Sequence, residues 1–274
     1  MRTGVRRPYL RLLAPALGAL LSGCSLDVGR PAPPEFDADL IAEVTRLLRE
    51  VREAPTVADL TRFGLPGDVS VLQLACFPVV SGDTTRNANR VPVDQVNAWP
   101  AGRCTRSDVQ VRAFSGSVRV QDLGGRFAAR VTHGVSGVLG RGGSDVQVDF
   151  NGTLDVRAVD DTTGEARIAR RLSLRTVAPA APAANLQVQE FAYRWVDRLG
   201  VPRGTASIAA NRVLVEGTLT RVSSGATRDS VRVDFSSLTP LEPDGRCLVG
   251  YRVGEVEMRV TGTRSGITRF QLSC

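Results

Sequence analysis

Alternation of apolar and polar residues between Asp145 and Val177 is the feature that most constrains the fold of this 274-residue chain. Apolar residues occupy every second position from Val146 to Val156, apart from Gly152, and polar residues fill the positions between them. The pattern resumes from Ala166 to Leu174 after a turn-forming stretch at 160–164. A period of two places one side of each strand in a core and the other in water, so the stretch predicts a long antiparallel hairpin. An unbroken strand of this kind would reach roughly 45 Å, which predicts a bulge at Gly152.

Shorter alternating runs occur through most of the remaining chain. They lie at 109–120, 186–195, 213–222, 231–235, 253–260 and 267–272, and Gly, Pro or Asp residues bound them. Residues 69–76 are also predicted as a strand, and residues 81–103 as a polar loop containing two prolines. The fold class that follows is mainly β: an antiparallel sandwich or open barrel of many strands, with one N-terminal amphipathic helix.

The helix is predicted between Asp37, which can cap its start, and Glu53, two residues before Pro55. Its apolar residues recur at helical spacing, at Leu40, Ile41, Val44, Leu47, Leu48 and Val51. The opposite side carries Asp39, Glu43, Arg46, Glu50 and Arg52. Because this side is acidic as well as basic, packing on the protein's own sheet is favoured over adsorption to a membrane surface.

An alanine- and proline-rich connection at 177–185 divides the β region. The organisation predicted is a helix and first β-unit at 37–176, followed by a second β-unit at 186–274. One continuous β domain remains an alternative, with the connection exposed on its surface.

The N-terminus has the composition of a secretory signal. A basic stretch at 1–11 contains four arginines and is followed by an apolar run from Leu12 to Leu21. This run is about half the ~20 residues that a membrane-spanning helix needs. Leu21-Ser22-Gly23-Cys24 then resembles the lipobox of bacterial lipoproteins. The resemblance covers only the first 25 residues, and no family is recognised for the mature domain. It implies removal of residues 1–23 and acylation of Cys24, for example by palmitate.

Removal of the predicted signal peptide changes the net charge from which a partner would be inferred. The formal net charge of +7 falls to about +3 once the four signal arginines are removed, so nothing in the balance indicates a nucleic-acid partner. The chain contains no lysine, which is interpreted as a compositional bias rather than as a set of guanidinium sites. Residues 24–36 include Pro31, Pro33 and Pro34 and are predicted to be a flexible tether between membrane and domain.

Assignment of Cys24 to lipid leaves an even number of cysteines: Cys76, Cys104, Cys247 and Cys274. In an oxidising compartment such a set predicts two disulfides. Pairing of Cys76 with Cys104 and of Cys247 with Cys274 is favoured because each pair is local in sequence. A four-thiolate zinc site is disfavoured because no CxxC spacing occurs.

Candidate catalytic residues are few. His133 is the single histidine, and Ser136 and Ser144 are its nearest serines along the following stretch, but neither lies in a Gly-x-Ser-x-Gly elbow. A hydrolase using His133 is therefore kept only as a remote alternative. Calcium binding by Asp160, Asp161 and Glu165 is disfavoured against a simple turn, and no metal or cofactor is expected.

One aromatic cluster is a speculative ligand site. Phe191, Tyr193 and Trp195 share one face of a predicted strand, where aromatic rings bind sugars or apolar ligands, or fill a β-sheet core. Core packing is the favoured interpretation of this cluster.

The function predicted is that of a membrane-anchored envelope lipoprotein, most simply a non-catalytic structural or binding module with a protein or apolar-ligand partner. The alternative is a carrier of lipid or another apolar ligand in a β-sheet cavity. In the order of its elements alone, the chain is similar to outer-membrane lipoproteins that receive acylated cargo. In lipoproteins resembling this one, the residue after the cysteine influences sorting, and Ser25 implies the outer membrane.

Overall fold

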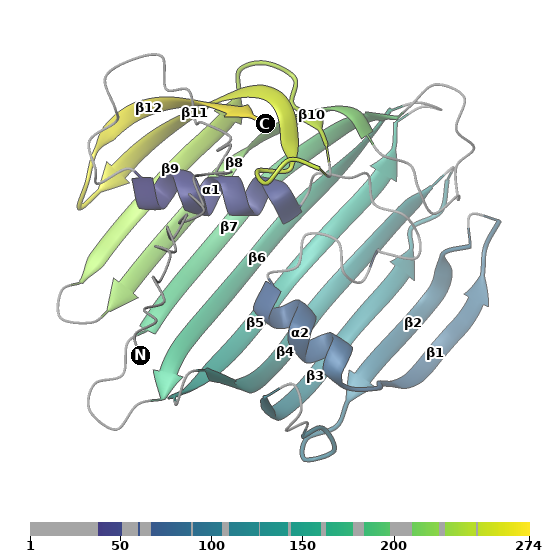
Figure 1. Cartoon of the computed structure of the whole chain (residues 1–274). Coiled ribbons are helices and arrows are strands. Elements are labelled where there is room, and N and C mark those ends of the chain that lie inside the picture. The colour runs from purple at the N-terminus through teal and green to yellow at the C-terminus, as the bar shows by residue number, and fades with distance from the viewer. Residues whose placement is uncertain are drawn as a thin grey trace, which may run out of the picture.

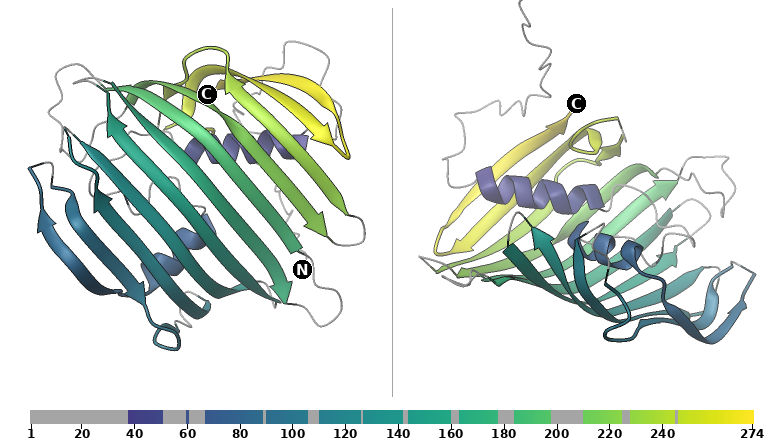
Figure 2. Two further views of the ribbon diagram at one scale, coloured as in Figure 1. Left: turned by 180° about the vertical axis from the view of Figure 1, so that it is seen from behind. Right: turned by 60° about the horizontal axis from the view of Figure 1, so that its bottom comes forward.

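The computed structural model describes residues 38–50, 60, 67–88, 90–105, 110–125, 127–141, 144–159, 163–177, 184–197, 210–224, 228–244 and 246–274. Over these ranges, strands account for most of the chain and form one antiparallel sheet with two helices on one face (Figures 1 and 2). The predicted mainly β class and its N-terminal helix are confirmed. The sheet is a single open layer rather than a sandwich. The predicted signal peptide, Cys24 and tether lie outside the described residues.

The described strands follow one another across the sheet in chain order as far as β9. Their bounds are β1 Val79–Arg86, β2 Pro92–Trp99, β3 Val111–Asp122, β4 Ala128–Arg141, β5 Ser144–Ala158, β6 Thr163–Val177, β7 Ala184–Asp197, β8 Ala210–Ser224 and β9 Asp229–Ser237. The chain then forms β10 Glu242–Pro243, β11 Tyr251–Gly262 and β12 Gly266–Ser273. Strand β11 pairs with β9, β10 and β12, so the C-terminal strands complete the edge opposite β1.

The two halves predicted on either side of residues 177–185 contribute to the same sheet. Strand β6 pairs with β7 from Thr163↔Val196 to Arg175↔Ala184 without a shift of register. The sheet is therefore continuous at the point where the alanine- and proline-rich connection occurs in the sequence.

The predicted hairpin is formed by β5 and β6, and its length is confirmed. The prediction of a bulge at Gly152 is wrong, because the two strands pair from Asp145↔Val177 to Ala158↔Gly164 with no shift of register. Gly152 serves packing instead: a Cβ atom at this position would lie 3.0 Å from the Cβ of Arg170 on the neighbouring strand. The glycine makes room for that side chain while the strand continues.

Helix α1, Ala38–Glu50, lies over the C-terminal half of the sheet, as the purple helix in Figure 1 shows. Its predicted apolar stripe is buried: Leu40, Val44, Leu47 and Leu48 have at most 1% of their surface exposed. The hydroxyl of Tyr251 donates a hydrogen bond of 2.7 Å to the carbonyl oxygen of Leu48 near the C-terminal end of the helix. Packing on the protein's own sheet, as the sequence favoured, is confirmed.

Two predictions in the stretch 69–103 are wrong. Residues 67–75 form a second helix, α2, Gly67–Ala75, rather than a strand, and it packs over β3, β4 and β5. A short apolar run fits either periodicity, and the burial of Val69, Leu72 and Ala75 follows the helical one. The predicted polar loop instead contains β1 and β2. Strand β1 is polar because it is an edge strand with every residue exposed.

The two faces of the sheet differ in chemistry. Apolar side chains on the helix-bearing face, which we call the inner face, form the hydrophobic core together with α1 and α2. The opposite outer face carries cross-strand ion pairs such as Arg119–Asp94 and Arg130–Asp155, with N–O distances of 2.6 Å. This division is what alternation along each strand requires when one face is in water.

Candidate functional site

A network of polar side chains crosses the inner face beneath α1, where the sequence pattern predicts apolar residues. It runs from β6 through β7 to α1, and then to β8, β9 and the turn between β11 and β12. We call it the polar network. Its members are Arg170, Gln189, Gln187, Glu43, Arg46, Arg221, Asp39, Asp229, Thr263 and Arg264.

Arg221 on β8 is the centre of the network. Its side chain is 12% exposed and binds three carboxylates: Glu43 at 3.1 Å, Asp39 at 2.8 Å and Asp229 at 2.9 Å. Glu43 and Asp39 belong to α1, so a single guanidinium connects the helix to two strands. Register explains this position, because Arg221 pairs with Gln187 and Val231, which also face inward.

Arg264, in the turn between β11 and β12, supplies a second cation. It donates to both oxygens of Asp39, at 2.8 and 3.0 Å, and to Asp229 at 3.0 Å. The two arginines and two aspartates thus form a closed set of charge-assisted hydrogen bonds around the first turn of α1. The Thr263 hydroxyl donates a further hydrogen bond to Asp229.

Amide side chains extend the network toward the centre of the sheet. Gln187 donates to Glu43 and accepts from Gln189 at 2.9 Å, and Arg170 donates to Gln189. Arg170 is 5% exposed, and its guanidinium lies 5.6 Å from the centroid of the Phe191 ring, within the range of a cation–π contact.

These contacts keep the carboxylates ionised. The hydrogen bond from Arg264 and the neighbouring Arg221 lower the pKa of Asp39 from 3.8 to about 2. The Thr263 hydroxyl, followed by Arg221 and Arg264, also lowers the pKa of Asp229. A carboxylate with a lowered pKa does not take up a proton near neutral pH, so these groups position the helix rather than transfer protons.

The sequence prediction placed Asp39, Glu43 and Arg46 on the solvent side of the helix, and for Glu43 this was wrong. The Glu43 side chain is only 10% exposed because Arg221 and Gln187 bind it from the sheet. The sequence contained an indication of this network, because polar residues replace apolar ones at inward positions of three strands. These residues are Arg170 on β6, Gln187 and Gln189 on β7, and Arg221 on β8. Polar residues at buried positions need partners, and the helix charges supply them.

His133 lies on the inner face of β4 and is 5% exposed. Its ring contacts Phe150 edge-on with centroids 5.5 Å apart. The structure does not bring it together with either candidate serine. Ser136 lies on the outer face, where its hydroxyl donates to Asp149 at 2.6 Å. Ser144 lies eight residues along β5 from Gly152, the partner of His133, or roughly 25 Å away at ~3.3 Å per residue.

The predicted aromatic cluster is buried where it is described. Phe191 and Tyr193 face inward from β7 with 5% and 0% exposure, and Phe191 packs against Phe235 at a centroid distance of 6.4 Å. The side chain of Trp195 lies outside the described part of the structure, as do Asp160 and Asp161. Glu165, the third candidate calcium ligand, accepts from Arg157 at 2.7 Å on the outer face.

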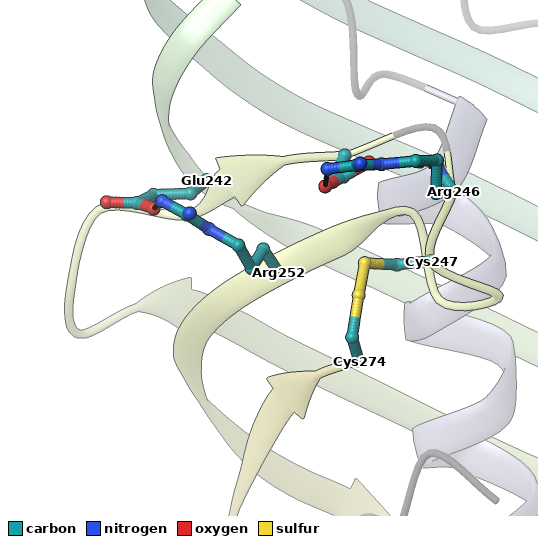
Figure 3. The surroundings of a disulfide bond; sticks show 6 residues. Glu242, Arg246, Cys247, Arg252 and Cys274 are labelled. Carbon is teal, nitrogen blue, oxygen red and sulfur yellow. Dashed lines mark hydrogen bonds and ion pairs between the residues drawn. A yellow bond between two sulfur atoms is a disulfide. The ribbon is translucent and has the colours of Figure 1, made fainter. Parts of the chain in front are cut away.

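The predicted cysteine pairing is confirmed. Cys76 and Cys104 form one disulfide, with Cα atoms 5.8 Å apart, and Cys247 and Cys274 form the other at 5.1 Å. Figure 3 shows the second bond beside the exposed ion pair of Glu242 and Arg252. The disulfides lie at opposite ends of the strands, next to the start of β1 and at the end of β12.

A shallow depression of about 490 Å³ on the outer face is lined by charges of both signs, including Glu165, Arg167, Glu190, Arg194 and Glu216. No group of three or more His, Cys, Asp or Glu side chains in the described ranges has metal-binding geometry. None of the helices described is long and apolar enough to cross a membrane.

Comparison with known proteins gives no relative. No protein-family model matches the sequence, and neither a curated protein nor a solved structure matches the chain.

Proposed function

We propose that this chain is an envelope lipoprotein, anchored to a membrane by acylation of Cys24, whose β domain is a non-catalytic structural or binding module. The observation that carries the proposal is the pairing of Cys76 with Cys104 and of Cys247 with Cys274. Two disulfides fit an exported protein and leave Cys24 as the one cysteine of the sequence without a disulfide role. Its position at the end of a signal-like segment suits lipid attachment.

The packing of the inner face favours a module over a carrier. Val148, Phe150, Leu154 and Val156, whose face would have to line a carrier cavity, are at most 2% exposed. Helices α1 and α2 occupy the same side of the sheet. The polar network fastens α1 in place with arginine–carboxylate contacts on three further elements, which suits a domain with a fixed interior.

The anchoring test is substitution of Cys24 in the native host. Wild-type protein should incorporate labelled palmitate and fractionate with membranes, whereas Cys24→Ala should incorporate none and lose that anchorage. Wild-type protein that carries no acyl group would refute the lipoprotein assignment.

Native mass spectrometry of the chain from Ser25 onward separates module from carrier. We expect ligand-free protein at the mass of the polypeptide. A stoichiometric, co-purified lipid that dissociates on collisional activation would instead establish the carrier. The envelope location, with the outer membrane as the proposed compartment, is tested by separating inner and outer membranes before immunodetection.

A further inference from the structure

Helix α2 and the residues after it expose an apolar surface. Among the described residues, five exposed large apolar side chains fall within one stretch of ten: Val71, Leu74, Phe77, Val79 and Val80. Successive side chains of a strand point to opposite faces, so Val79 and Val80 of β1 do not share one surface. We call Val71, Leu74 and Phe77 the Phe77 patch. Phe77 is 96% exposed and Leu74 is 61% exposed. The other exposed apolar side chains are scattered over separate strands and turns. Concentrated apolar exposure of this kind marks an interaction surface.

The apolar side chains on α2 form two stripes. Val69, Leu72 and Ala75 face the sheet and are buried, whereas Val71 and Leu74 face away from it. Phe77 follows just beyond the C-terminal end of the helix and is the most exposed apolar side chain of this stretch. Folding uses only the first stripe, so the second is available to a partner.

Phe77 is held on a rigid support. The preceding residue, Cys76, is joined to Cys104, and its carbonyl oxygen accepts a hydrogen bond of 2.9 Å from the buried indole of Trp99. These two contacts fix the backbone at the residue immediately before Phe77. A side chain presented on an anchored backbone loses less conformational entropy on binding than one on an unanchored segment.

The patch lies at the end of the sheet to which the N-terminal segment connects. As far as β9 the strands follow one another antiparallel in chain order, so β1 and β9 begin at the same end of the sheet. Phe77 lies two residues before the start of β1. Asp39, at the start of α1, is bound through Arg221 and Arg264 to Asp229, the first residue of β9. Figure 1 shows α1 and α2 on the same side of the sheet.

The chain between Cys24 and Ala38 is long enough for the acyl group proposed at Cys24 and the Phe77 patch to reach the same bilayer. Fourteen residues span at most about 50 Å when extended. The eight strand spacings from β1 to β9 cover about 38 Å. A lipid attached at Cys24 can therefore lie in the same membrane surface that meets the Phe77 patch. Arg103 is exposed beside Cys104 and adds a cation suited to anionic headgroups.

We propose that the Phe77 patch inserts into the surface of a phospholipid bilayer and orients the domain with the starts of β1 and β9 toward the membrane. This inference rests on the proposed lipid anchor for its geometry. The patch adds a second, weaker membrane contact to the acyl chain, and two signals are what stable anchoring requires.

The first test uses the chain from Ser25 onward, which carries no acyl group. Every described helix and strand lies after residue 37, so this chain keeps the whole described fold. Its partition onto phosphatidylcholine–phosphatidylglycerol vesicles is measured by flotation. Phe77→Ser should lower the partition coefficient about tenfold, since an aromatic side chain no longer leaves water. Leu248→Ser is the matched control, because Leu248 is 75% exposed beside Cys247 at the opposite strand end.

The second test uses the acylated full protein reconstituted in vesicles containing brominated lipids. The emission of the tryptophan introduced by Phe77→Trp is obtained by subtracting the spectrum of the parent protein. This emission should be blue-shifted and should be quenched by the brominated lipids. Leu248→Trp should give neither effect. Equal behaviour of the two variants in both tests, or absence of measurable partition and quenching, would overturn the inference. Failure of the lipid anchor is read separately, from the intact mass at Cys24, and leaves the flotation result unaffected.

Discussion

The two helices cover the same face of one sheet but are attached to it in different ways. Helix α1 buries an apolar stripe and adds charged contacts from Asp39 and Glu43 to Arg221 and Arg264. Helix α2 is attached by apolar contacts and a neighbouring disulfide, and it leaves a second apolar stripe in solvent. Burial alone holds a helix, whereas charge pairing also fixes its orientation. An apolar surface that folding does not require is the better guide to function.

Removal of Arg221 should have the largest effect on stability. Arg221→Met leaves Glu43, Asp39 and Asp229 without their shared cation, and breaking a buried ion pair in this way costs about 3–5 kcal/mol. The loss is measured as the free energy of unfolding in urea. Arg232→Met is the control: its pair with Asp234 is 57% and 41% exposed, so it should cost about 1 kcal/mol or less. Similar losses in the two variants would mean that the ion pairs of Arg221 add nothing to the apolar contacts of α1.

Loss of the disulfide beside α2 should have the next largest effect. The loop closed by Cys76 and Cys104 has a sequence separation of 28 residues. The chain-entropy model gives about 3.5 kcal/mol for a loop of this length. The Cys76→Ser/Cys104→Ser double variant should therefore unfold at lower urea and lose hydrogen-exchange protection first in α2. Protection lost equally in α1 would show that the two attachments are not independent.

Substitutions on opposite sides of α2 compare its two stripes directly. Leu72 is fully buried, and Leu72→Ala should destabilise the protein by about 3 kcal/mol through the cavity it leaves. Leu74→Ala removes the same atoms from a side chain that is 61% exposed, and surface changes of this kind stay within about 0.5 kcal/mol. Both variants are measured by thermal and urea unfolding. A large cost at Leu74 would mean that the outer stripe contributes to folding and would weaken its assignment to a membrane.

Sequence periodicity predicts α1 and misses α2 for a physical reason. Thirteen residues of α1 carry one apolar stripe and one charged side, which only the helical period explains. The nine residues of α2 are apolar on both sides, so periods of two and of 3.6 fit equally well. Strand β1 was not predicted because an edge strand has little to bury, and β2 beside it is buried only at its two ends. Contacts with distant parts of the chain determine whether these segments form a helix or a strand, and such contacts cannot be read from a single sequence.

The sequence could predict that buried arginines of the sheet bind carboxylates of the helix, but not which residues pair. An inward arginine such as Arg221 must find a carboxylate, and the sequence offered Asp39 and Glu43 on the helix. Asp39 and Glu43 are separated from Arg221 by 182 and 178 residues, and their meeting depends on the register of the seven intervening strands, which local patterns do not fix. Disulfide pairing was easier to predict because each pair is separated by fewer than 30 residues.

Low pH should destabilise α1 but not α2, and this is the smallest of the expected effects on the free energy of unfolding. The pKa of Asp39 is about 2 in the folded protein and 3.8 without its arginine partners, so its contribution to stability is complete above pH 4. That contribution is lost as pH falls through about 2, because protonation removes the charge that Arg264 and Arg221 bind. Since the Asp39 side chain is 46% exposed, solvent screening reduces the effect to about 1 kcal/mol.

Asp39→Asn isolates this contribution from the general effect of acid. The variant should be about 1 kcal/mol less stable than the parent at pH 6, and the difference should shrink toward zero near pH 2. Hydrogen exchange at low pH should report opening of α1, while α2, whose buried contacts Val69, Leu72 and Ala75 carry no charge, should keep its protection. Loss of both helices at the same pH would show that the charged attachment of α1 and the apolar attachment of α2 belong to one cooperative unit, and that the difference between them lies in specificity rather than in local stability.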